Sequence, residues 1–211
     1  MTTPDLQAAS AAIDLADSAI ATAIARLTEL GGPDQQQVFA YELAHAGAGI
    51  ATAKAMLGEG AMGDVEAALT CGFAADAIHD LVTKLIGREQ LWGVEASSLS
   101  DAHEFVSTYR DPEFLASLAT TQGPRHLNGD MEMVQDTFRA FAANVIGPHA
   151  EHVHRENGDV PEEIVEGLAE IGAFGLSVPA EYGGYSEGGD EEYLGMVIAT
   201  EELSHASLGI G

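Results

Sequence analysis

Apolar residues recur every three or four positions through most of this 211-residue chain, and no stretch alternates apolar and polar residues as a half-buried strand would. Residues 5–30 carry one such stripe. It comprises Ile13, Ala16, Ile20, Ile24 and Leu27. Alanine and glycine are frequent and aromatic residues are few, a composition that favours closely packed helices. We therefore predict an all-α protein.

Three further helices are predicted before residue 120. The second runs from about 34 to 57, has many small residues, and is broken at 58–60. Asp64 could cap the third, which extends to Gly87. Its apolar residues are Val65, Leu69, Ile78, Leu81, Val82 and Leu85. The fourth starts at Ser100 or Asp101 and restarts at Asp111-Pro112, with Asp111 as N-cap and Pro112 at the first helical position.

Residues 120–130 are polar and rich in helix breakers, which is typical of a domain boundary. We predict a helical amino-terminal extension over 1–125 and a second helical domain over 126–211. In the second domain one helix places four apolar residues on one face. They are Val134, Phe138, Phe141 and Val145. Gly147-Pro148 should kink or interrupt this helix.

The next helix begins at Pro161 and leads into a constrained loop. Ile164, Leu168 and Ile171 follow helical spacing, and glycines at 172 and 175 end the pattern. Residues 175–184 then read Gly-Leu-Ser-Val-Pro-Ala-Glu-Tyr-Gly-Gly. Pro179 fixes its own φ and pushes the preceding residue toward an extended conformation. The glycine pair at 183–184 permits backbone angles or close approaches that a Cβ would forbid. Such a loop suits a pocket wall.

A last helix, from 190 to about 205, carries Glu-Glu-Leu at 201–203, about 17 residues after the glycine pair. From about residue 130 onward this order resembles the amino-terminal helical domain of acyl-CoA dehydrogenases, which are FAD-dependent flavoproteins. By this resemblance Tyr182, Gly183 and Gly184 would shape the entrance of the substrate pocket. Four residues at the end of the chain would approach the acyl chain or the flavin. They are Leu208, Gly209, Ile210 and Gly211.

The resemblance also implies a reaction and partners. A glutamate removes the α-proton of the acyl-CoA, a β-hydride passes to FAD, and electrons continue to electron-transferring flavoprotein. The family continues beyond the equivalent of Gly211 into a β domain and a four-helix bundle, so we expect this chain to be truncated. The catalytic glutamate and most FAD contacts of the family lie in those parts, so the catalytic and FAD-binding residues here stay unknown. A homodimer or homotetramer is expected.

The extension over 1–125 lies outside the common plan of the family. It is similar in size to that of a member acting on (2S)-methylsuccinyl-CoA, so dehydrogenation of this thioester to mesaconyl-CoA is the expected reaction. Two alternatives stay open. One is another short- or medium-chain acyl-CoA dehydrogenase or oxidase, and the other is a non-catalytic helical assembly module.

The formal net charge of −26 argues against binding nucleic acid or an anionic membrane through a basic patch. It fits either a solvated acidic shell, as in salt adaptation, or a charged docking surface. The sequence shows no uncharged apolar run long enough to cross a bilayer and no signal peptide at its start, so a cytoplasmic protein is expected. The single cysteine, Cys71, cannot form an internal disulfide and is interpreted as a small buried hydrophobe.

Several motifs have two interpretations. Gly47-Ala48-Gly49 lacks the strand and the third glycine of a dinucleotide fingerprint, so helix packing is favoured. His149 and His152 share a helical face, yet a solvated surface is favoured over a metal site, and no metal is expected. His205 is interpreted as a surface or core residue more readily than as a pocket residue. Adjacent Glu201 and Glu202 point about 100° apart, which favours one partly buried, hydrogen-bonded carboxylate and one exposed.

Overall fold

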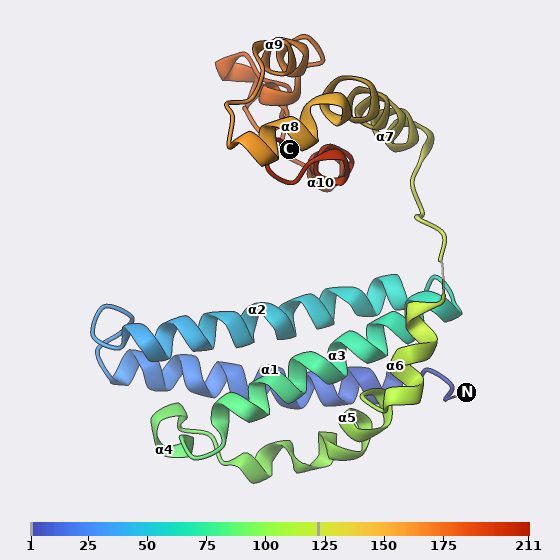
Figure 1. Cartoon of the computed structure of the whole chain (residues 1–211). Coiled ribbons are helices and arrows are strands. Elements are labelled where there is room, and N and C mark those ends of the chain that lie inside the picture. Colours follow the sequence, from blue (N-terminus) through green and yellow to red (C-terminus); the bar gives the residue numbers. More distant parts are fainter. Residues whose placement is uncertain (1, 122) are drawn as a thin grey trace. The chain divides into compact units, whose positions relative to one another are not determined.

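The computed structural model describes residues 2–121 and 123–211, which divide into two compact units, Met1–Pro124 and Arg125–Gly211 (Figure 1). Within the described residues, the elements are helices, and the only extended pairing is an isolated bridge between Pro179 and Ser186. The prediction of an all-α chain is confirmed.

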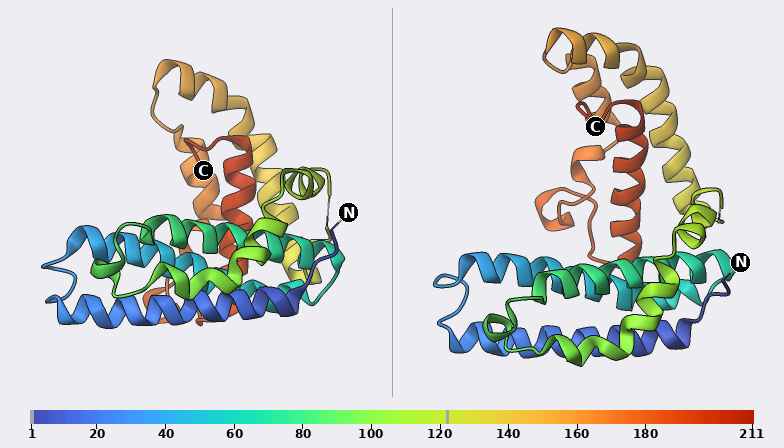
Figure 2. Two further views of the ribbon diagram at one scale, coloured as in Figure 1. Left: turned by 90° about the horizontal axis from the view of Figure 1, so that it is seen from below. Right: turned by 60° about the horizontal axis from the view of Figure 1, so that its bottom comes forward.

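The amino-terminal unit consists of three long helices with a chain of short ones packed against them. Their bounds are α1 Leu6–Glu29, α2 Gln37–Gly60, α3 Asp64–Leu85, α4 Glu89–Trp92, a 3-10 segment Ala96–Ala102, α5 His103–Tyr109 and α6 Pro112–Ala119. The three long helices pack on one another, and the 3-10 segment and α5 pack on α1 and α3 (Figure 2). The core therefore lies along the three-helix contact.

Small side chains fill much of this core. The buried stripe of α1 is Ala9, Ala12, Ile13, Ala16, Ala19, Ile20 and Ala23. Across it, a Cβ on Gly47 of α2 would lie 3.6 Å from Cγ2 of Ile20, so Gly47-Ala48-Gly49 serves helix packing as predicted. Ile24 was expected in the stripe and is 53% exposed. It follows the buried Ala23 and so points about 100° away from the packed face. Leu69 of α3, expected inside, is also exposed.

Two predicted helix ends are wrong, and one is confirmed. α2 runs through the expected break and ends at Gly60, where a Cβ would lie 2.8 Å from Thr70 Oγ1. Gly60 thus allows α3 to approach closely. Asp64 is the first residue of α3 and Gly63 is its N-cap. Asp111 caps α6 as predicted, because its Oδ1 accepts from the amides of Glu113 (2.9 Å) and Phe114 (3.2 Å).

α1 is long and apolar enough to cross a membrane, with a mean hydropathy of 1.3 over its most apolar window. Core helices of soluble proteins pass the same test, and the stripe of α1 packs into this core. Cys71 of α3 is fully buried, as predicted, and its burial raises the pKa of the thiol. A thiol held in its neutral form is a poor nucleophile.

The carboxy-terminal unit surrounds a smaller core. Its elements are α7 Gly129–Phe141, a π-helical turn Ala142–Ile146, α8 Gly147–Glu156, α9 Glu162–Glu170, 3-10 turns Ala173–Gly175 and Ala180–Tyr182, and α10 Asp190–Ala206. α10 packs along α7. The buried residues are Phe138, Ala142, Ile146, Ile164, Leu168, Ala199 and Leu203. The predicted apolar spacing in α9 is confirmed by burial of Ile164 and Leu168.

The predicted interruption at Gly147-Pro148 takes the form of the π-helical turn. Proline has no N–H to donate to the carbonyl four residues back, so the regular ladder cannot continue through this point. Instead, the amide of Gly147 bonds to the carbonyl of Ala142, five residues back. The helix is locally widened, and α8 continues from it.

The alanine-rich packing of α1 can be tested by comparing two isoleucines. Ile13→Ala should lower the free energy of unfolding of the amino-terminal unit by about 2–5 kcal/mol, because it leaves a cavity. Ile24→Ala should change it by about 0.5 kcal/mol or less, as a surface substitution does. The chain's one tryptophan, Trp92, is buried beside Phe39 in this unit, so its fluorescence in urea follows this unit. Equal losses in the two variants would contradict the assignment of the packed face.

Candidate functional site

The glycine pair of the 175–184 loop does what its sequence predicts. Gly183 has φ of 85°, in the left-handed region that favours glycine. At Gly184 a Cβ would collide with the carbonyl oxygen of Val178. Pro179, with φ of −57° and ψ of 147°, holds the chain in an extended conformation directly after Val178. The loop conformation therefore requires a glycine at 184.

Backbone hydrogen bonds close this loop on itself. The amide of Ser186 donates to Val178 O (3.0 Å), and the amide of Ala180 donates to Ser186 O (3.1 Å). The Tyr185 ring lies over two glycines: a Cβ on Gly172 or on Gly175 would be 2.8 Å from its nearest ring carbon. The sequence pattern identified these glycines only as a helix end. Their second role, as a platform for an aromatic ring, was missed.

Glu192 of α10 accepts hydrogen bonds from the end of the loop. Its carboxylate accepts from Ser186 Oγ (2.7 Å), the Glu187 amide (2.7 Å) and the Gly188 amide (3.0 Å). These donors lower the pKa of the Glu192 carboxyl, the two amides and the hydroxyl all favouring its charged form. Sequence reasoning missed this residue. The available signal was its position three residues after the N-cap glycine, where a glutamate can reach back to preceding amides.

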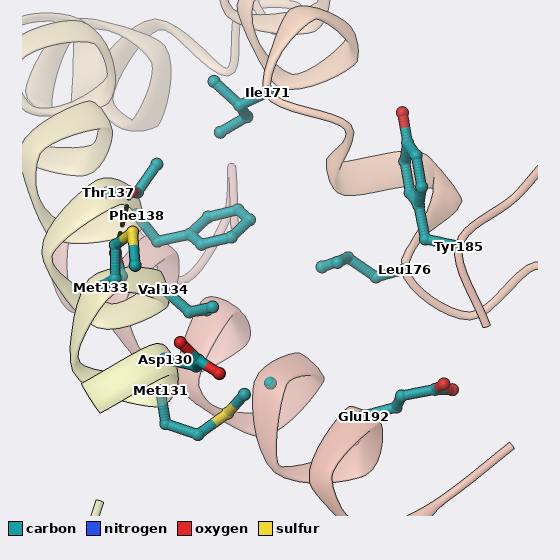
Figure 3. A pocket seen from close by; sticks show the side chains of 11 residues that line it. Asp130, Met131, Met133, Val134, Thr137, Phe138, Ile171, Leu176, Tyr185 and Glu192 are labelled. Carbon is teal, nitrogen blue, oxygen red and sulfur yellow. Dashed lines mark hydrogen bonds between the residues drawn. The ribbon is translucent and has the colours of Figure 1, made fainter. Parts of the chain in front are cut away.

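A half-open hollow of about 550 Å³ lies between α7, this loop and α10. Its lining is Asp130, Met131, Met133, Val134, Thr137, Phe138, Ile171, Leu176, Tyr185, Glu192 and Gly195. Figure 3 shows the α7 side chains on one side and Leu176 and Tyr185 facing them across the gap. The lining is mostly apolar, and its charged members are carboxylates. It suits an apolar group rather than an anion.

The residues predicted to bind substrate do not line this hollow. Tyr182 is 74% exposed at the tip of the loop, and Leu208 is 85% exposed. Gly209 has open space around its Cα, whereas Ile210 packs against the core. Contact with substrate stays a prediction for all seven residues named from the sequence. They are Tyr182, Gly183, Gly184, Leu208, Gly209, Ile210 and Gly211.

Gly211 is held against α10. Its amide donates to Ser207 O (2.9 Å), and a Cβ on it would lie 2.7 Å from the carbonyl carbon of Leu203. The turn after α10 therefore folds back on the helix and leaves Leu208 and Gly209 at its outer edge.

Two arginine–glutamate pairs anchor α10. Arg139 of α7 bonds Glu202 through Nε (3.1 Å) and Nη2 (2.8 Å), and Arg125 bonds Glu201 through Nη1 (3.1 Å) and Nη2 (2.6 Å). The side chain of Glu202 is 9% exposed and that of Glu201 is 50% exposed. The predicted division into one buried and one exposed carboxylate is confirmed, although the exposed one is also paired. Arg139 lowers the pKa of Glu202 against the opposing effect of burial.

The three clustered histidines at 149, 152 and 154 all lie in α8. His149 bonds Glu163 of α9 (Nε2 to Oε1, 2.5 Å). Among the described residues no group of three histidine, cysteine, aspartate or glutamate side chains is placed to hold a metal ion. His205 is exposed and lines a second hollow, of about 470 Å³, beside the two arginine–glutamate pairs. It therefore lies at the surface and at the edge of a hollow at once.

The carboxy-terminal unit combines a closed glycine loop with an acidic helix held by two ion pairs. Sequence comparison shows which protein family this unit is similar to. Residues 128–211 match the family described as "Acyl-CoA dehydrogenase, N-terminal domain". The match covers the carboxy-terminal unit from residue 128 onward, and the resemblance noted from its sequence is confirmed.

Three relatives illustrate the match. (2S)-Methylsuccinyl-CoA dehydrogenase of Cereibacter sphaeroides is 42% identical over 91 residues, which are 43% of this chain and 16% of that protein. Glutaryl-CoA dehydrogenase of Desulfococcus multivorans is 38% identical over 82 residues, 39% of this chain and 21% of that protein. Subunit CarC of the caffeyl-CoA reductase-Etf complex of Acetobacterium woodii is 32% identical over 76 residues, which are 36% of this chain and 19% of that protein. The chain thus spans about a fifth of the length of these relatives.

The family implies FAD, and the carboxy-terminal unit fits only part of such a ligand. Its basic residues are Arg125, Arg139 and Arg155, and each is paired with a glutamate. Among its described residues, every arginine that could meet the phosphates of FAD or CoA is thus already in an ion pair. Its apolar hollow and exposed turn could face an acyl chain or an aromatic ring. We assign no step of flavin chemistry to these residues.

The pair between Arg139 and the buried Glu202 predicts a pH dependence. Because the folded pKa of Glu202 is lowered, its stabilisation is complete above the unfolded value of about 4.3 and is lost as the pH falls through the folded pKa. Glu202→Gln should lower the free energy of unfolding of the carboxy-terminal unit by about 1.5–3 kcal/mol at pH 7 and flatten this acid-side decline. Urea titrations between pH 7 and pH 3, followed by far-ultraviolet circular dichroism, measure both effects.

The adjacent Glu201 provides the matched control. Glu201→Gln removes a carboxylate from a half-exposed pair and should cost less than about 1 kcal/mol. Trp92 fluorescence should report an unchanged amino-terminal unit in both variants. An acid-side decline as steep in Glu202→Gln as in the wild-type chain would show that Glu202 is not its source.

Proposed function

We propose that this chain is the amino-terminal part of an FAD-dependent acyl-CoA dehydrogenase, and that its carboxy-terminal unit forms one wall of the acyl-binding cleft. The observation that carries the proposal is the match of residues 128–211 to the family, in a unit with a closed 175–184 loop and an anchored α10. The reaction class is α,β-dehydrogenation of an acyl-CoA thioester.

In this proposal the unit contributes shape and exclusion of water. The turn after α10 presents Leu208 and Gly209 outward, where an apolar and a small residue leave room for an acyl chain. The Arg139–Glu202 pair fixes the end of α10 and therefore the position of this turn. Closing a site against water strengthens the hydrogen bonds that stabilise an enolate developing at a thioester carbonyl. The catalytic base is not placed in this chain.

For the substrate we propose (2S)-methylsuccinyl-CoA, with mesaconyl-CoA as product. Support comes from the 42% identity to the dehydrogenase of Cereibacter sphaeroides that is named for this thioester. Glutaryl-CoA is the second candidate, because a 38% identical relative is named for it. Electron-transferring flavoprotein is the proposed electron acceptor, supported by the relative named as a subunit of a reductase-Etf complex. A cytoplasmic homo-oligomer completes the proposal.

The experiment uses the full-length native protein. We expect purified protein to show the visible absorption bands of a flavin, and anaerobic addition of the correct thioester to bleach them. Turnover of (2S)-methylsuccinyl-CoA, glutaryl-CoA and butyryl-CoA with an artificial electron acceptor ranks the substrates. A colourless protein that turns over none of them would favour the non-catalytic assembly module.

Gly209 offers a sharper test of the proposed wall. Gly209→Val adds a branched side chain where the folded unit leaves open space, so the melting temperature should stay within about 2 °C of wild type. If the turn faces the acyl chain, the same change should lower kcat/KM at least tenfold. Gly58→Val, also in open space but in the amino-terminal unit, is the matched control. Unchanged kcat/KM in Gly209→Val would remove this turn from the binding site.

A further inference from the structure

A third hollow, in the amino-terminal unit, has the character of a ligand site. The geometry points to a binding site between α3 and α5 for a small amphipathic anion, a molecule with an aliphatic body and a carboxylate or phosphate head. This inference does not rest on the proposed dehydrogenase activity, because residues before 128 lie outside the family match.

The floor of the site is apolar. The hollow has a volume of about 640 Å³ and lies where α3 faces the 3-10 segment and α5. Its aliphatic lining is Ile78, Val82, Leu99 and Val106. Pockets for small molecules commonly have volumes of 300–1,000 Å³ and an apolar lining with a few placed polar groups. This hollow satisfies both conditions.

The rim supplies hydrogen-bond donors that the protein does not use. Nε of Arg110 donates to Asp76 (2.7 Å), and neither Nη group has an acceptor among the described residues. His79, His103 and Ser107 also line the hollow, and their side chains have no hydrogen bond or ion pair within the described part of the chain. A guanidinium fork beside two imidazoles matches the oxygens of a carboxylate or a phosphate.

Two carboxylates, Asp76 and Asp111, lie close to this rim. Asp111 lines the hollow, but its Oδ1 accepts two amides as the cap of α6. Asp76 faces Arg110 at a single nitrogen. The other cations of the unit pair singly with carboxylates elsewhere: Arg26 with Glu29, Lys54 with Asp17, Lys84 with Asp80 and Arg88 with Glu42. The anionic head group is therefore inferred from the free donors at the rim, which lie over an apolar floor.

The test measures binding of three eight-carbon probes to the 211-residue chain by isothermal titration calorimetry. Octanoate, octyl phosphate or both should bind, and octylamine, with the same body and a cationic head, should bind at least tenfold more weakly. Binding by octanoate alone or by octyl phosphate alone would identify the head group. Failure of both anionic probes to bind, or equal binding of octylamine, would overturn the inference.

Variants locate the site. Arg110→Gln should weaken the anionic probe at least tenfold, the usual effect of losing a hydrogen bond to a charged group. His103→Ala, at an exposed position, should weaken it several-fold without touching the Arg110–Asp76 pair. Lys54→Gln, which removes an exposed cation between α1 and α2, should leave affinity unchanged. Trp92 fluorescence verifies that each variant is folded, and unchanged affinity in folded Arg110→Gln would place the binding elsewhere.

Discussion

No side chain can stand at position 184, because the backbone there lies against the carbonyl oxygen of Val178. This one contact determines the path of the chain on both sides of it. It lets Ser186 bond back to Val178, which in turn brings the Tyr185 ring over Gly172 and Gly175. Glu192 then ties the following segment to the start of α10. Backbone and side-chain hydrogen bonds therefore connect the loop to the start of α10.

Charge is the second constraint on this protein. With 34 acidic and 8 basic side chains, each cation is surrounded by possible partners, and the structure pairs every arginine of the carboxy-terminal unit with a glutamate. The pair at Glu202 is the least exposed of these, so it contributes more than a surface ion pair does. The same pairing leaves this unit without spare cations for a phosphorylated ligand. The carboxy-terminal unit can therefore contribute to binding through apolar contacts and through its shape.

Much of the fold could be predicted from the sequence, because helical spacing and capping chemistry act locally. Asp111 and Pro112 started a helix as expected, and Gly183 and Gly184 adopted the conformation and the close contact that their lack of a Cβ allows. Predictions of buried residues were wrong where alanine and glycine form most of the packed helix surface. Ile24 looked like a core residue by hydrophobicity, yet the face centred on Ala9, Ala16 and Ala23 is the one that α1 buries.

The site was harder to predict than the fold. The sequence indicated which loop is constrained, but a hollow arises from where three segments meet, and no local rule gives that position. Met131 and Met133 therefore entered the lining without any distinguishing pattern. Glu192 and the ring of Tyr185 were missed for the same reason, since their partners lie in separate turns of the chain.

The π-helical turn at Ala142–Ile146 carries one residue more per turn than the α-helices that flank it. Each residue of an α-helix advances the side-chain direction by about 100°, so this extra residue sets the rotation of α8 relative to α7. In the observed rotation His149 faces Glu163 of α9. Removing one residue here would rotate His149 by about 100° about the helix axis and turn it away from α9. The number of residues between Phe138 and His149 therefore determines which side of α8 faces α9.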